Sequence, residues 1–226
     1  HAEEFLKGFS GYLTCDGFSG YNKLKKVIRC GCLAHMRRYW YDALPEKMKT
    51  ASERPPAEIG FDYCNQLFKL EEKYAGLDAD TRKAKRLETE PAIWEAYWSW
   101  LETVNPTGGS RLEKAVTYAR NQKPYMENYL LNGRCSISNN IAENIARPYA
   151  VGRKNFLFHD TVKGARSSAI IYSLVETAKL NNLNIYAYLE TVLLYMPDYK
   201  NEPEGIEELM PWSEMIQQRC RIESKS

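Results

Sequence analysis

The sequence lacks a long hydrophobic run and has little excess of either charge. No apolar stretch approaches the roughly 18 residues that a membrane-spanning helix needs, and no basic segment followed by an apolar one opens the chain. We therefore expect no membrane partner and no signal peptide. Lys and Arg number 31 against 29 Asp and Glu, a net charge of +2. Any contact with nucleic acid must therefore come from local clusters of cations.

The cysteines lack the regular spacing of a disulfide framework. There are six, scattered through predicted core segments. They are Cys15, Cys30, Cys32, Cys64, Cys135 and Cys220. This pattern predicts free, buried thiols in a reducing cytoplasm.

The 226 residues, 44% of them hydrophobic, can fill the core of one large domain or two small ones. The chain opens at His1 without a Met, so we expect it to be part of a longer or processed protein.

The first 44 residues predict a compact β-α-β-α unit. Strands are expected at 11–16 and 26–31, a short helical stretch at 18–25, and a helix at 34–44. The order implies two parallel strands joined by a short right-handed crossover. Asp16 would then lie at the carboxyl end of a strand, where ligands collect in open α/β sheets.

A helical region is predicted between residues 57 and 131. The stretch from Pro45 to Pro55 indicates a loop before it, 105–110 indicates a turn within it, and Asn132-Gly133 indicates a turn or left-handed cap after it. An aromatic stripe runs along one segment, at Trp94, Tyr97, Trp98 and Leu101. The stripe could stack nucleic-acid bases, but apolar residues at helical spacing favour a core.

Glu143 lies on a predicted helix that Ser138, Asn139 and Asn140 would cap and that Pro148 would interrupt. Glu143 and Arg147 are four residues apart, so they share a face. An ordinary surface ion pair is one interpretation and part of a functional site is the other.

The segment 152–158 begins with a flexible glycine and predicts a loop leading into an aromatic strand. It carries Arg153, Lys154 and Asn155, side chains that suit phosphate contacts.

The remaining segments predict helices and a tail. A helix at 163–181 is apolar over a wide arc, which predicts that it is largely buried. Glu176 falls within that arc, as a structural carboxylate with a partner, a support for metal ligands, or a substitute ligand. A further helix runs from 184 to 196, and the tail beyond it contains a short anchor at 209–212.

Two sets of residues suggest a metal. Cys32 and His35 could begin a zinc site with Cys30 and His159, but packing or phosphate contact is favoured for His35. Asp16 and Glu143, on separate rigid elements beside cations, suit a divalent-metal site that acts on a phosphate backbone. Such a site normally needs a third carboxylate on an earlier strand, and no Asp precedes Asp16.

Four ordered motifs carry a family resemblance. They occupy residues 11–22, 31–38, 139–155 and 172–181. Together they resemble the insertion-sequence-sixty-six family of bacterial transposases, over nearly the whole chain and most weakly at 46–130. The pattern departs from the family at Asn144, where Arg is frequent, and at Cys15. The first departure removes one cation beside Glu143.

The resemblance implies a fold and a domain plan. The fold class is α-rich α/β, the remnant of an RNase H-like fold with a short parallel strand pair and a large helical insertion. The expected segments are a partial β-α-β-α unit at 1–45, the insertion at 46–135, core helices with the catalytic Glu at 136–198, and a tail at 199–226. An unpaired edge of so small a sheet predicts self-association or a mostly helical core.

The resemblance also implies a DDE recombinase, which cleaves and joins DNA during transposition. Asp16 matches the family's second carboxylate and Glu143 its third, while the first is expected upstream of His1. Mg²⁺ or Mn²⁺ is the implied cofactor, held by oxygen ligands. Glu176 and His35 are candidates for supporting these ligands. The implied DNA-contacting residues are Arg37, Arg38, Arg147, Arg153, Lys154 and Asn155.

The expected partners are transposon-end DNA, target DNA, a second copy of the chain, and accessory proteins of the same element, all in the bacterial cytoplasm. We expect the chain by itself neither to cut nor to join DNA. The alternative is a non-catalytic DNA-binding or assembly module derived from a transposase.

Overall fold

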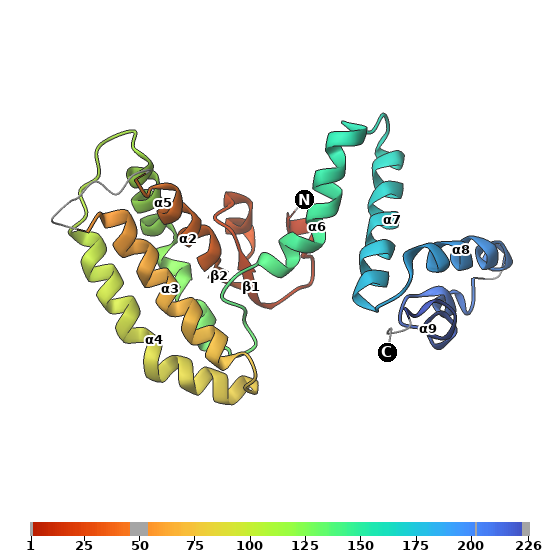
Figure 1. Cartoon of the computed structure of the whole chain (residues 1–226), viewed down its shortest axis with the longest axis horizontal. Coiled ribbons are helices and arrows are strands. Elements are labelled where there is room, and N and C mark those ends of the chain that lie inside the picture. The colour runs from red at the N-terminus through yellow and green to blue at the C-terminus, as the bar shows by residue number, and fades with distance from the viewer. Residues whose placement is uncertain (1, 46–53, 202, 223–226) are drawn as a thin grey trace. The chain divides into compact units, whose positions relative to one another are not determined.

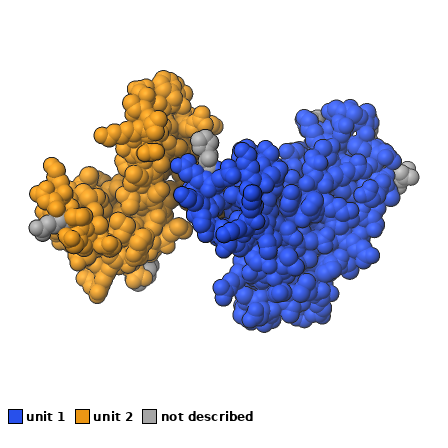
Figure 2. Space-filling model, turned by 180° about the vertical axis from the view of Figure 1, so that it is seen from behind, with its two compact units in different colours: residues 1–141 blue, residues 142–226 orange. Residues whose placement is uncertain are grey.

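The computed structural model describes residues 2–45, 54–201 and 203–222. Helices dominate it, and the described residues form one sheet, of two parallel strands (Figure 1). The predicted α-rich α/β class with a short parallel strand pair is therefore confirmed. The described residues form two compact units, 1–141 and 142–226, which Figure 2 colours separately.

In the first unit the elements are α1 (Ala2–Phe5), β1 (Gly11–Cys15), the 3₁₀ helix η1 (Ser19–Lys23), β2 (Val27–Gly31), α2 (Leu33–Asp42), α3 (Pro56–Tyr74), α4 (Ala79–Glu102), α5 (Arg111–Met126) and η2 (Asn128–Leu131). α6 (Asn140–Phe156) begins at the boundary between the units. In the second unit α6 is followed by α7 (Val162–Leu180), α8 (Ile185–Tyr195), η3 (Met196–Tyr199), η4 (Ile206–Leu209) and α9 (Glu214–Cys220).

The strand pair forms as the sequence predicts. β1 and β2 run parallel, with Gly11 opposite Val27 and Cys15 opposite Gly31. The short connection between them contains only η1. Asp16 therefore lies directly after the carboxyl end of β1.

Four helices supply most of the first core. α2 packs on both α3 and α5, and α3 packs on α4. Trp40 is fully buried between α2 and α3, where a Cβ added at Gly60 would lie 2.4 Å from its ring. All members of the aromatic stripe on α4 are buried, so their predicted place in the core is confirmed.

A buried charge network ties α3 and α4 to the chain that leads toward α6. Arg86, fully buried, donates to the two carboxylate oxygens of Glu71 at 2.6 and 2.5 Å. It also donates to the carbonyls of Tyr129, Asn132 and Cys135. Since a buried charge is costly unless it is paired, these bonds hold the 129–135 segment firmly against α4.

Of the two alternatives predicted for Asn132-Gly133, the turn is confirmed and the left-handed cap is not, because neither residue is left-handed. Asn132 is extended, with φ at −146°, and Gly133 does not have a positive φ. Close approach explains the glycine instead, because a Cβ there would lie 1.8 Å from the carbonyl oxygen of Ala79.

Two predictions about α6 are wrong. The helix continues through Pro148 to Phe156, so 152–156 is helical and no strand comes after it in the described residues. Leu157, with φ at +56°, turns the chain toward α7 instead. Packing outweighs the hydrogen bond lost at proline, because Tyr149 beyond it contacts Tyr172 with ring centroids 5.3 Å apart.

α7 has the predicted length but not the predicted burial. Only Ala178 is fully buried, while Ile170 and Ile171 are 61% and 54% exposed. Within the second unit the core lies at the carboxyl end of α7, against α8 and the tail. The tail contributes Leu209 and Ile216 to that core, so it is more than a single anchor at 209–212.

Several smaller expectations can also be compared with the structure. All six cysteines are free and buried, as predicted. Residues 46–53 of the predicted loop lie outside the described residues. The boundaries at 45, 135 and 198 stay predictions. Within the described part of the chain, no helix has the length and apolar character needed to cross a membrane.

Candidate metal and nucleic-acid site

Asp16 presents a carboxylate with one oxygen engaged and one available. Its Oδ1 accepts a hydrogen bond from the backbone N–H of Phe18 at 3.0 Å. Among the described residues none donates to Oδ2. The half-buried carboxylate is therefore fixed by its own turn and retains a ligand atom for a cation.

Arg29 places a buried positive charge beside Asp16. It is 8% exposed, its Nη2 lies 3.5 Å from the Asp16 carbonyl oxygen, and its guanidinium lies 4.1 Å from the ring centroid of Tyr125. It also donates to the side chain of Asn22. No carboxylate forms an ion pair with Arg29 in the described part of the chain, which leaves its charge available to an anion such as phosphate.

Two side chains of α5, Tyr118 and Gln122, face the same place, although no motif in the sequence indicates them. A Cβ built on Gly17 would lie 2.9 Å from Gln122 Nε2 and 3.1 Å from the ring of Tyr118. Both residues therefore lie against the residue directly after Asp16. The available signal was Gln122 itself, a polar residue at helical spacing between the buried Ala119 and Met126.

Cys32 and His35 belong to the start of α2. The Cys32 N–H donates to the Cys15 carbonyl at 3.0 Å, and the Asn139 N–H approaches Cys32 Sγ at 3.5 Å. Burial favours a higher pKa for the Cys32 thiol, but hydrogen bonds from His35 and Asn139 outweigh this effect of burial. The net result is a lowered pKa. The free thiols of Cys30 and Cys135 are hydrogen-bonded to each other.

Side chains with metal-binding groups do not gather into a ready-made site. The described residues contain no cluster of three or more His, Cys, Asp or Glu placed to hold a metal ion. Asp16 therefore lacks a complete set of ligands around it in the described part of its unit.

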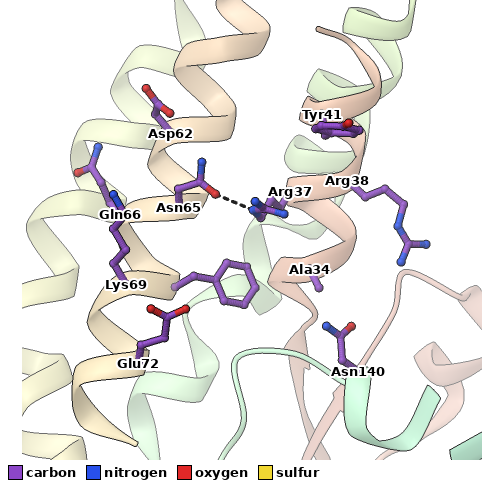
Figure 3. A pocket seen from close by; sticks show the side chains of 11 residues that line it. Ala34, Arg37, Arg38, Tyr41, Asp62, Asn65, Gln66, Lys69, Glu72 and Asn140 are labelled. Carbon is purple, nitrogen blue, oxygen red and sulfur yellow. Dashed lines mark hydrogen bonds between the residues drawn. The ribbon is translucent and has the colours of Figure 1, made fainter. Parts of the chain in front are cut away.

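A polar groove of about 740 Å³ runs between α2 and α3 (Figure 3). Arg37 points from α2 toward α3, where its Nε donates to Asn65 Oδ1 at 2.6 Å. Its guanidinium also lies 4.4 Å from the ring centroid of Phe61. Arg38 and Lys69 line the same groove, so two further cations accompany an arginine that is already held in position.

α6 separates its charged residues from its packing residues. Glu143 lies in the first turn, and Arg147 and Lys154 come 4 and 11 residues later, close to whole turns, on the same face. Tyr149 and Gly152 lie on the other side, against Tyr172 of α7. Arg153, Lys154 and Asn155 are exposed at the carboxyl end of the helix.

Glu176 has a structural partner. It pairs with Lys179 at 2.6 Å, and its side chain is 16% exposed. It also lines a small, mostly apolar pocket between α6 and α7, together with Tyr149 and Tyr172. This accounts for a carboxylate in the apolar arc without a metal.

The arrangement defines a class: an α-rich α/β protein with a carboxylate at the end of a parallel strand, a second on a helix, and cations suited to phosphate. Comparison with known families then identifies the chain. Its residues 1–167 match the transposase IS66 family, and residues 173–212 match the IS66 C-terminal element. The chain belongs to the IS66 transposase family.

Three relatives come from Sinorhizobium fredii (strain NBRC 101917 / NGR234). The uncharacterized protein y4qI is 31% identical over 92% of this chain and 40% of its own length. The uncharacterized proteins y4hP and y4jD are 27% and 28% identical, each over 94% of this chain and over 41% and 43% of their own lengths. The chain thus spans about two fifths of these relatives. No solved structure matches it significantly.

Proposed function

We propose that this chain contributes two carboxylates, Asp16 and Glu143, to a DNA transposase that cleaves and joins phosphodiester bonds with a divalent metal. The observation that carries the proposal is Asp16 itself. In a member of this family, it lies at the end of a parallel strand and keeps one carboxylate oxygen available. The strand pair would then belong to an RNase H-like fold.

The residues present fit Mg²⁺ or Mn²⁺. Asp16 and Glu143 offer the oxygen ligands that these ions prefer, whereas the six thiols are buried. Asp16 and Glu143 would hold the ion, and Arg29 would supply positive charge close to Asp16. A bound ion would supply activation of the attacking oxygen and stabilisation of the leaving oxygen. A further carboxylate has to complete the set.

Transposon-end and target DNA are the proposed partners. Phosphate contacts come from Arg37 and Arg38 in the groove and from the exposed cations on α6. The held position of Arg37 supports its role, because a fixed guanidinium loses little freedom when it binds phosphate.

The proposal is tested by cleavage of labelled element-end DNA in Mg²⁺, with the protein in the full length that its gene encodes. Asp16→Asn and Glu143→Gln keep the shape of each side chain and remove its charge. Each should lower the cleavage rate at least a hundredfold. Glu95→Gln, at an exposed position on α4, is the matched control and should leave the rate unchanged.

Two results would contradict catalysis. Cleavage that survives Asp16→Asn would remove Asp16 from the metal site. DNA binding without any cleavage in Mg²⁺ or Mn²⁺ would favour the alternative of a non-catalytic binding or assembly module. Because Asp16 has no complete ligand set in its own described unit, we expect the 226-residue chain alone to be inactive.

Self-association is part of the proposal. The two-stranded sheet leaves strand edges that no other described strand covers, and such edges recruit further chains. Light scattering over a range of concentrations should show a mass above that of one chain. A monomeric mass at every concentration would contradict self-association and leave the proposed catalytic role unaffected.

A further inference from the structure

Polar atoms without hydrogen-bond partners gather beside Asp16. Among the buried side-chain atoms of the described residues that lack a partner are Gln122 Oε1 and Tyr118 Oη. Gln122 is 7% exposed, and it and Tyr118 both lie against Gly17. Both residues come from α5 and lie beside the end of β1.

Buried polar atoms of this kind destabilise the protein unless a further group forms hydrogen bonds with them. A buried polar group without a partner destabilises a protein by about 1–3 kcal/mol, so few are retained without a reason. Burial raises the pKa of the Tyr118 hydroxyl, and the nearby charges of Cys32 and Asp16 add to this. Tyr118 therefore stays protonated and can both donate and accept.

The donor and acceptor capacities of these atoms indicate which group could form hydrogen bonds with them. The carboxamide oxygen of Gln122 only accepts hydrogen bonds, so a phosphate oxygen, which also only accepts, cannot pair with it. A water molecule can donate to Gln122 Oε1 and also bond to Tyr118 Oη. Mg²⁺ usually keeps several of its waters, and Asp16, whose Oδ2 is available, directly precedes Gly17, against which both side chains lie.

We propose that Gln122 and Tyr118 bind and orient a water molecule of the hydrated divalent cation held by Asp16. This inference rests on the proposed function and deepens it. Both residues are positioning residues, and both come from the helical region between the two carboxylates. One helix of that region would therefore complete the surroundings of the metal.

Mn²⁺ binding tests the inference without any need for catalysis. Water-proton relaxation reports the waters on bound Mn²⁺, and the titration uses the protein in the full length that its gene encodes. Tyr118→Phe removes only the hydroxyl, and Gln122→Met keeps the length of the side chain. Each should weaken Mn²⁺ binding about tenfold, while Asp16→Asn should abolish it. Tyr63→Phe, in the core beside Tyr97, is the matched control and should bind as the native protein does.

Thermal unfolding in a metal chelator separates this role from a structural one. Removing a buried hydroxyl that has no partner should leave Tyr118→Phe as stable as the native protein or more stable. Weaker Mn²⁺ binding in a fully folded variant therefore supports the inference.

Two results would overturn it. Native Mn²⁺ affinity in both Tyr118→Phe and Gln122→Met, with loss in Asp16→Asn, would reject the water and leave the proposed function intact. Native affinity in Asp16→Asn, or no Mn²⁺ binding by the native protein, would reject the Asp16 metal site and the inference with it.

Discussion

Glu90 shows how a single buried carboxyl group can set the response of the first unit to pH. It has no exposed surface, and one of its oxygens accepts a hydrogen bond from Tyr129. Burial raises its pKa to about 7, the hydrogen bond from Tyr129 opposes the rise, and the charge of Glu71 adds to it. The folded state thus favours the neutral acid.

The first prediction is that stability falls as pH rises. The pKa of Glu90 in the folded state lies above the usual 4.5. Its contribution to the free energy of unfolding is therefore complete below pH 4.5 and is lost as pH rises through about 7. Between pH 5 and pH 8 the loss should be roughly 2 kcal/mol. Glu90→Gln, which mimics the neutral acid, should reduce this slope in urea unfolding measured at several pH values.

Glu95→Gln is the control for that experiment, since Glu95 is exposed on the same helix. Equal slopes in native protein and Glu90→Gln would show that Glu90 does not titrate as described.

Single residues could be placed from the sequence where neighbouring residues in the chain determine their position. Asp16 was placed correctly because the apolar pattern of β1 fixes where the strand ends and so which residue comes next. Gln122 and Tyr118 were missed because they reach Gly17 only through the packing of α5, more than 100 residues along the chain. Spacing in the sequence does not carry such contacts.

At the scale of elements, the contact between α2 and α3 depends on one glycine. Gly60 lets the two helices approach until the ring of Trp40 fills the space that a Cβ would occupy. This contact also forms the walls of the groove that holds Arg37 and Asn65.

The second prediction is that Gly60→Ala destabilises the first unit. The added methyl would meet the rigid Trp40 ring, so we expect a loss of about 1–3 kcal/mol in urea unfolding. Gly76→Ala has open space around its Cβ and serves as the control. A Gly60→Ala protein as stable as the native one would mean that the helices are less tightly packed than described.

The third prediction concerns the charged face of α6. Arg147→Ala and Lys154→Ala should each weaken DNA binding and lower the slope of log affinity against log salt by about 1, because each phosphate contact releases about one counterion. Fluorescence anisotropy over a range of roughly 50 to 200 mM salt measures both quantities.

Lys85→Ala is the matched control, since Lys85 is exposed and already paired with Glu88 at 2.8 Å. An unchanged salt slope in both α6 variants would remove this face from the DNA contacts.

Element types could be predicted from the sequence more reliably than element ends. Periodicity indicated the strands, α2, the α4 core stripe and α8, because each has a local apolar pattern. The predicted interruption of α6 at Pro148 is wrong, because packing contacts beyond the proline outweigh the one hydrogen bond that it removes. The predicted burial of α7 is wrong, because an apolar arc allows a helix to be buried but does not supply the helices that would cover it.

At the scale of the whole molecule, the placement of the cations matters more for contact with DNA than the net charge does. A balance of +2 is nearly neutral, yet exposed cations gather at the carboxyl end of α6, and three cations line the groove together with Asp62 and Glu72. Family membership rests on both units, since the two matched segments together cover most of the chain.

Asp16→Cys, in the protein at the full length its gene encodes, gives the sharpest test of whether Asp16 is a metal ligand for DNA cleavage. A thiolate binds Mn²⁺ better than Mg²⁺, which strongly prefers oxygen. We predict that cleavage of element-end DNA is lost in Mg²⁺ and partly restored in Mn²⁺, with no such restoration in Asp16→Ala. Equal cleavage by Asp16→Cys and native protein in Mg²⁺ would contradict the assignment of Asp16 as a ligand.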